Sequence, residues 1–173
     1  MRRPFLVLVA AALLMSLGIL FLYNRSSRRV TKPDLYGAVA RKDHKEVTRL
    51  LKEGSSANQQ DPRVIELAEE VGYKAGVMLP IHQAALAGDA KMIEILLNAG
   101  ADPNARGIKN ITPLQFAASQ NAPDAVQLLL SHGADPLLRD DSGTSALDVA
   151  RRRGFSEVVQ ILEQALPGPK DKA

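Results

Sequence analysis

The sequence contains no cysteine and no tryptophan, and aromatic residues make up only 4% of its 173 residues. Without cysteine the chain has no disulfide, no thiolate metal ligand and no thiol nucleophile, although this fits both oxidising and reducing compartments. Hydrophobic residues nevertheless reach 46%. We therefore expect a core of Leu, Val, Ile and Ala, an aliphatic composition that favours helices.

Acidic residues are absent from the first 32 positions, which hold six basic ones. The rest of the chain has 16 basic and 19 acidic residues, so the net charge of +3 and the basic character come from the N-terminal segment alone. A mildly acidic folded part argues against a nucleic-acid-binding surface. We expect no nucleic-acid partner.

Residues 5–23 form one uncharged apolar run, FLVLVAAALLMSLGILFLY. At a helical rise of about 1.5 Å per residue the run reaches roughly 28 Å, close to the ~30 Å hydrocarbon core of a bilayer. The run predicts a transmembrane signal-anchor helix at 5–23. A short basic N-terminus at 1–4 precedes it, and a basic juxtamembrane linker at 24–32 follows.

A cleaved signal peptide is the alternative interpretation, because the chain starts Met-Arg-Arg like an export signal. The length of the run, and the basic stretch that follows it in place of a small-residue cleavage pattern, favour an uncleaved anchor. Basic residues flank both ends almost equally, so the positive-inside rule hardly orients the span. We expect a single-pass membrane protein with an extracytoplasmic domain, periplasmic if bacterial; a cytoplasmic domain stays open.

A period of 33 residues organises the remainder of the chain. Ile81, Leu114 and Leu147 lie 33 positions apart, and Gly100 and Gly133 do so as well. Ile81 stands in PIHQAA and Leu114 in PLQFAA, and the two glycines stand in LLNAGADP and LLSHGADP. Because many positions recur in register, the period indicates a repeat architecture.

These motifs resemble the ankyrin repeat family, with its T-P-L-H-x-A-A helix start, its V-x-x-L-L second helix and its G-A-x-x-N ending. The resemblance covers residues 33–166. It implies an all-α solenoid of about four helix-turn-helix units, at 33–58, 79–104, 112–137 and 145–166. Stacking buries the apolar face that one unit cannot bury alone. The first and last units depart from the pattern, and we expect them to cap the stack.

Local signals fit this pattern. In the third unit Thr112 can cap the first helix, with Pro113 at its first position. Pro123 can open the second helix, and Gly133 can adopt the left-handed conformation that ends it. In the first unit Lys42 replaces the mid-repeat glycine.

Two further segments fall outside the period. The first two units are separated from each other by 13 extra residues within 59–78. In this segment Asp61, Pro62 and apolar residues at helical spacing predict a short additional helix. The tail at 167–173 is expected to be disordered.

The histidines and acidic loops suggest no catalysis. At His82 the resemblance implies a hydrogen bond to backbone between repeats, His132 suits a helix C-terminus, and His44 is expected to be solvated. Residues 140–143 lack the later ligands of a cation loop and match the family's inter-repeat turn. No nucleotide-binding or serine-nucleophile motif occurs. We expect no enzyme activity, cofactor, metal or small-molecule substrate.

The resemblance implies that a partner protein binds the concave face, formed by turn tips and by exposed positions of the first helices. We expect Leu86, Ile108 and Phe116 to be its apolar anchors, with Phe116 packing only within the stack as the alternative. The triple arginine at 151–153 could bind phosphate or an acidic partner, with a solvated helix end as the alternative. The candidate residues are Gln83, Leu86, Arg106, Ile108, Lys109, Phe116, Ser119, Gln120, Arg139, Asp141, Arg152 and Arg153.

Together these features predict a membrane-tethered module for protein–protein interaction, a non-catalytic scaffold or an inhibitor or regulator of its partner. One alternative is a structural component of a membrane assembly. Another is an exported soluble ankyrin protein after signal-peptide cleavage. The partner cannot be named from the sequence, because one fold hosts many functions.

Overall fold

The computed structural model describes residues 34–60 and 78–166. The predicted membrane span at 5–23, the extra helix expected from Asp61 onward and the tail at 167–173 lie outside these residues. Within the described ranges no helix is both long enough and apolar enough to cross a membrane.

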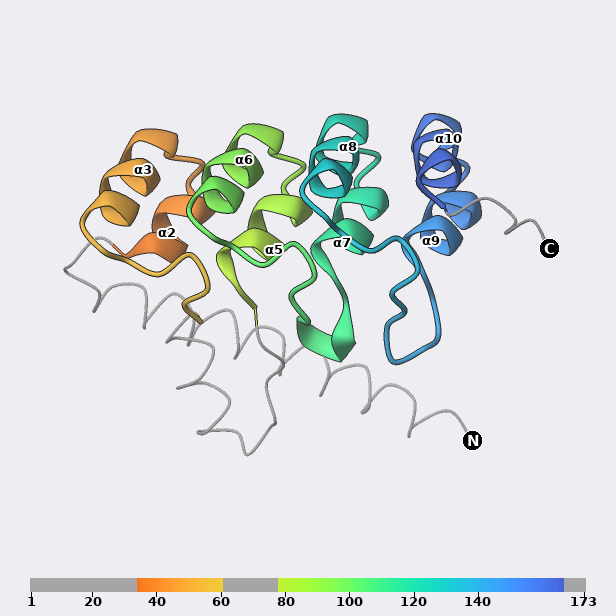
Figure 1. Ribbon diagram of the computed structural model, residues 1–173, viewed down its shortest axis with the longest axis horizontal. Helices are drawn as coiled ribbons and strands as arrows, with labels where there is room; N and C mark the ends of the chain where they lie inside the picture. Colours follow the sequence, from red (N-terminus) through yellow and green to blue (C-terminus); the bar gives the residue numbers. More distant parts are fainter. Residues whose placement is uncertain (1–33, 61–77, 167–173) are drawn as a thin grey trace, which may run out of the picture.

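The described residues form four helix pairs and no β-strand, which confirms the all-α prediction. In Figure 1 the first helices form one row and the second helices form another. Each helix contacts its pair partner and the corresponding helix of the next pair. The first helices are α2 (Leu35–Ala40), α5 (Pro80–Leu86), α7 (Pro113–Ser119) and α9 (Ala146–Arg153). The second helices are α3 (His44–Lys52), α6 (Ala90–Asn98), α8 (Pro123–Ser131) and α10 (Ser156–Ala165), and a 3₁₀ turn, η1, spans Ile108–Asn110.

The helix starts follow the sequence signals. The Thr112 hydroxyl accepts a hydrogen bond from the Gln115 N–H, and the Gln115 side chain accepts one from the Thr112 N–H, which makes a reciprocal cap for α7. Pro113 and Pro123 occupy the first turns of α7 and α8. Gly133 has a φ of 88°, as its place after α8 requires.

The turn inside each pair contains one residue in the left-handed conformation, and in the first unit this residue is Lys42. Lys42 has a φ of 57° and is the first-unit counterpart of Gly88, Asn121 and Gly154, which have φ values of 64°, 52° and 74°. A lysine in this conformation is strained by about 1 kcal/mol relative to glycine. The first unit thus keeps the backbone geometry of the repeat without its usual residue.

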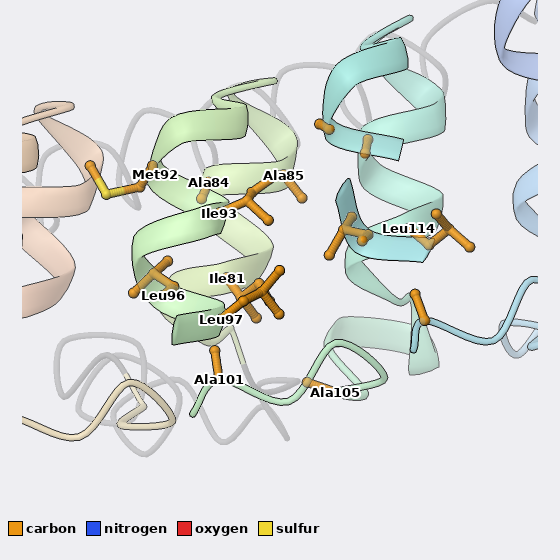
Figure 2. Close-up of a cluster of buried hydrophobic side chains, with 14 of the residues drawn as sticks. Ile81, Ala84, Ala85, Met92, Ile93, Leu96, Leu97, Ala101, Ala105 and Leu114 are labelled. Atoms are coloured by element: carbon orange, nitrogen blue, oxygen red, sulfur yellow. The ribbon is translucent and has the colours of Figure 1, made fainter. Parts of the chain in front are cut away.

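One continuous core joins the four pairs, and Figure 2 shows the part of it around α5, α6 and α7. Ile81, Ile93 and Leu114 are fully buried, and Met92 extends toward the first pair. The adjacent alanines of α5 and α7 are fully buried too, at Ala84, Ala85, Ala117 and Ala118. Because these side chains are small, neighbouring first helices can approach closely.

Two asparagines connect successive repeats through backbone hydrogen bonds. The Asn58 amide donates to the Gly100 carbonyl at 2.8 Å and accepts from the Asp102 N–H at 3.1 Å. Asn104 repeats this arrangement with Gly133 and Asp135, at 2.8 and 2.7 Å. Each amide therefore satisfies a carbonyl and an N–H at the end of the next second helix.

His82 is the buried polar residue that holds the loop before the third pair. Its Nδ1 accepts a hydrogen bond from the Leu79 N–H, and its Nε2 lies 3.1 Å from the Ala105 carbonyl oxygen. Both contacts fit a neutral ring that carries its proton on Nε2. Burial lowers the pKa of His82, and the Ala105 carbonyl and the Asp102 charge only partly offset that effect. The backbone-binding role implied for this histidine is confirmed.

The other two histidines also have partners. His44, expected to be solvated, instead lies 2.9 Å from the Asp89 carboxylate of the next pair. Asp89 itself caps α6 by accepting from the Met92 N–H. The expectation was wrong because the 13 extra residues conceal which position of the second unit faces His44. The His132 Nδ1 lies 3.0 Å from the Leu128 carbonyl at the C-terminal end of α8, as expected.

Replacing Asn104 with alanine should lower the free energy of unfolding by about 1–3 kcal/mol, because two hydrogen bonds between repeats are lost. Urea unfolding of the full chain in a non-denaturing detergent, followed by circular dichroism, measures the change. Asn98→Ala is the matched control: Asn98 is exposed on α6, so its loss should have little effect. Equal effects of the two substitutions would contradict the role given to Asn104.

Acidification should destabilise the fold through His82. Its pKa in the folded state lies below its ordinary value of 6.5, so the unfolded chain binds more protons. The contribution of His82 is therefore complete above pH 6.5 and is lost as the pH falls through 6.5 toward the folded-state pKa. In His82→Gln this part of the pH dependence should disappear. Identical slopes of unfolding free energy against pH in both proteins, between pH 7 and 5, would refute the assignment.

Candidate protein-binding face

We use the term first-helix face for the surface made by the exposed positions of α5, α7 and α9 and by the turn tips at 106–111 and 138–144. It carries eleven of the twelve candidate residues, and the twelfth, Gln120, directly follows α7. Leu86 and Ile108, two of the expected anchors, are 37% and 38% exposed. Phe116 is half-buried, and its ring meets that of His82 edge to face, with the centroids 6.0 Å apart. Phe116 thus packs within the stack and still reaches the surface.

The first turn tip is a tight loop. The Gly107 N–H donates to the Ile111 carbonyl at 2.9 Å, and the Asn110 N–H donates to the Gly107 carbonyl at 3.0 Å. Lys109 and Asn110 are left-handed, with φ values of 55° and 58°. A Cβ at position 107 would lie 3.0 Å from the His82 Nε2, a tight contact that glycine avoids.

Several candidate residues tie this tip to the next one. The Arg106 guanidinium donates to the Arg139 carbonyl at 2.7 Å and to the Asn110 carbonyl at 3.1 Å. The Asp141 N–H donates to the Lys109 carbonyl at 3.0 Å, and its carboxylate accepts from the Asn110 amide at 2.6 Å. Arg106 and Asp141 therefore already fix the spacing of the two tips.

Arg139 is likewise engaged within its own unit. Its guanidinium donates to the Gly143 carbonyl at 2.6 Å and to the Asp148 carboxylate at 3.0 Å. Hydrogen bonds from the Ser145 hydroxyl and N–H, with the nearby charge of Arg139, lower the pKa of Asp148. Arg139 sits 33 positions after Arg106, so the two arginines hold equivalent places in successive units.

A pocket of about 200 Å³ opens on the first-helix face between α7 and α9. Ile111, Phe116 and Val149 supply its apolar side chains. The other lining residues are polar or charged: Gln115, Ser119, Asp140, Arg152 and Arg153. Phe116, Ser119, Arg152 and Arg153 are candidate residues that the fold brings together here, whereas Leu86 and the candidates of the two tips lie outside the pocket: Arg106, Ile108, Lys109, Arg139 and Asp141.

Gln115 lines this pocket although it is not one of the candidate residues. It stands 33 positions after His82 and has the same task, since its amide donates to the Thr144 carbonyl at 2.6 Å. The repeat register could have revealed this equivalence. Ile111, in contrast, precedes the helix-capping Thr112 and carries no sequence signal for the pocket.

The three consecutive arginines at the end of α9 have different environments. Arg151 pairs with Glu163 of α10 at 2.6 Å. Arg153 donates to the Ser119 carbonyl of α7 at 2.9 Å. For Arg152, which is exposed, residues 34–60 and 78–166 provide no hydrogen-bond acceptor. Its guanidinium is the one of the three that keeps all its donors available.

The carboxylate in the pocket is held by its own turn. Asp140 accepts hydrogen bonds from the Ser142 N–H and hydroxyl and from the Thr144 N–H, at 2.6 to 2.9 Å. Burial would raise the pKa of Asp140, but these bonds and the charge of Arg152 outweigh it, and the pKa is lowered. Residues 140–144 therefore form a hydrogen-bonded turn between two repeats, as the resemblance implies.

The comparisons with known proteins agree with this architecture. A family model described as ankyrin repeats, in three copies, matches residues 81–170, which is more than half of the chain. The matched part begins in α5, and the pair α2/α3 ahead of it stacks on α5 and α6 in the same manner. No curated protein matches the sequence. The chain belongs to the ankyrin repeat family.

Proposed function

We propose that this protein is a membrane-tethered, non-catalytic module that binds a partner protein through its first-helix face and serves as a scaffold or as a regulator of that partner. Ankyrin repeats imply a protein–protein interaction module and are generally non-catalytic. The observation that carries the proposal is the pocket between α7 and α9, where an apolar surface lies beside the available guanidinium of Arg152.

The composition of this face supports binding. Hot spots of protein interfaces are enriched in aromatic residues and arginine and lie in well-packed pockets. Phe116 and Arg152 have this character, and Leu86 and Ile108 are further exposed apolar residues of the same face. A pocket with apolar and arginine side chains suits a protein partner.

The rigidity of the face supports the same role. The caps of α7 and α9 and the hydrogen bonds between the turn tips fix the surface before any partner arrives. A preorganised surface loses less conformational entropy on binding, so more of the contact energy appears as affinity.

Tethering rests on the uncharged run at 5–23 and the basic flanks around it. An anchor at this place would hold the repeats close to the bilayer and confine the search for a partner to the membrane surface. The alternatives are a structural role in a membrane assembly and release by signal cleavage.

The full chain, purified in mild detergent, should capture specific proteins from a membrane extract of its source. Replacing Leu86, Ile108 and Arg152 by alanine should reduce capture at least about tenfold, because these exposed residues would contact the partner directly. Arg106 and Phe116 are left unchanged in this variant, because their side chains also hold the fold. Quantitative mass spectrometry measures the capture.

The matched control replaces Lys91, Glu94 and Asn98, which are exposed on α6 in the row of second helices. This variant should capture as much as the parent protein, and both variants should show the same circular dichroism melting temperature as the parent. Full capture by the Leu86, Ile108 and Arg152 variant would refute binding through the first-helix face. Capture of the protein's own copies alone would favour the structural role.

The chain should stay in the membrane fraction during alkaline carbonate extraction, and removal of residues 5–23 should release it. Alkaline phosphatase fused after Ala173 should be active, because its disulfides form only outside the cytoplasm. An inactive fusion in the membrane would place the repeats on the cytoplasmic side. Release of the intact chain by carbonate would contradict the anchor.

A further inference from the structure

We infer that the pocket between α7 and α9 recognises an acidic segment of the partner, taking one apolar side chain into the pocket and pairing a neighbouring carboxylate with Arg152. This inference rests on the proposed function and names the chemistry of the partner at that site. Three observations carry it: the size of the pocket, the different hydrogen bonding of the three arginines, and the ionised carboxylate of Asp140.

The size of the pocket suits a side chain. Sites that enclose drug-sized ligands have volumes of roughly 300–1,000 Å³, whereas this pocket has about 200 Å³. Ile111, Phe116 and Val149 offer its occupant aliphatic and aromatic contacts. A leucine, isoleucine or phenylalanine of a peptide segment fits this environment.

The arginines determine the charge of the occupant. Arg151 is paired with Glu163 and faces away from the pocket lining. Arg153 uses one of its guanidinium N–H groups on the Ser119 carbonyl and keeps the others. Arg152 keeps all five. The edge of the pocket therefore offers a planar fork of donors, which matches the two oxygens of a carboxylate.

Asp140 limits which anion can bind. Its carboxylate is ionised and lies in the same pocket, and one of its oxygens accepts three hydrogen bonds from its own turn. With Arg152 and Arg153 the lining carries a net charge of +1. A carboxylate, with one negative charge, balances it, whereas a phosphate group carries about −1.5 to −2 and would leave the pocket with a net negative charge.

The carboxylate can come from an Asp or Glu side chain or from the C-terminus of the partner. Two random dodecapeptide phage libraries distinguish these sources, one displaying peptides in the interior of a coat protein and one displaying them with a free C-terminus. Both are selected against the full chain in detergent micelles. Enrichment of an apolar residue within three positions of Asp or Glu indicates a side chain, and enrichment of an apolar residue at the free end indicates a terminal carboxylate.

The enriched peptide is then synthesised and titrated by fluorescence anisotropy. Arg152→Ala should weaken binding about tenfold, Arg152→Lys should weaken it less, and Arg152→Glu should favour the peptide in which Lys replaces the acidic residue. Val149→Thr, which keeps the side-chain shape, should weaken binding through the apolar surface. Arg151→Ala is the matched control and should bind as the parent does.

Equal affinity of the parent and Arg152→Ala for the enriched peptide would overturn the inference, as would enrichment of basic or phosphorylatable sequences without acidic residues, or no enrichment in either library. These results would leave the proposed function intact if Leu86, Ile108 and Arg152 together still control capture of the partner. Loss of that control would instead refute the proposed function itself.

Discussion

The fold of the repeats depends on stacking, because a pair of helices 6 to 10 residues long cannot bury its own apolar face. The buried alanines of α5 and α7 let neighbouring pairs approach, and one aliphatic core runs through all four. Where neighbouring pairs pack closely, water no longer reaches the loop backbone. Its polar groups then need side chains as hydrogen-bond partners. His82, Gln115 and Asn104 supply those hydrogen bonds at repeating positions.

The same stack explains the first-helix face. Because the first helices lie in one row, positions that are 33 residues apart in the sequence become neighbours on one face. Arg106 holds the two turn tips together and Arg139 is engaged within its own unit, whereas Arg152, at the end of the row, is left available. The face thus contains residues that shape it and residues that are free to meet a partner, and sequence type alone does not separate the two.

The regular part of the fold could be predicted because it depends on residues that act over short distances in the sequence. Thr112, Pro113 and Pro123 act on helix starts within a few residues, and the period of 33 predicts which units stack. The contact of the His44 ring with the Asp89 carboxylate could not be predicted, since the extra residues between the first two units break the register that would align them. The pocket depends on Ile111, whose place follows only from how two units pack, and on Gln115, which the repeat register aligns with His82. Sequence alone does not tell which residues of the first-helix face hold the turns and which stay available.

The central claim is that the stacked repeats present the first-helix face to a partner protein. Hydrogen–deuterium exchange of the full chain in detergent, with and without the partner that it captures, tests this claim most directly. The account predicts added protection in residues 106–120 and 138–153, with little change in the second helices α6 and α8. Added protection confined to α6 and α8, with none in α7, α9 or the turn tips, would contradict it.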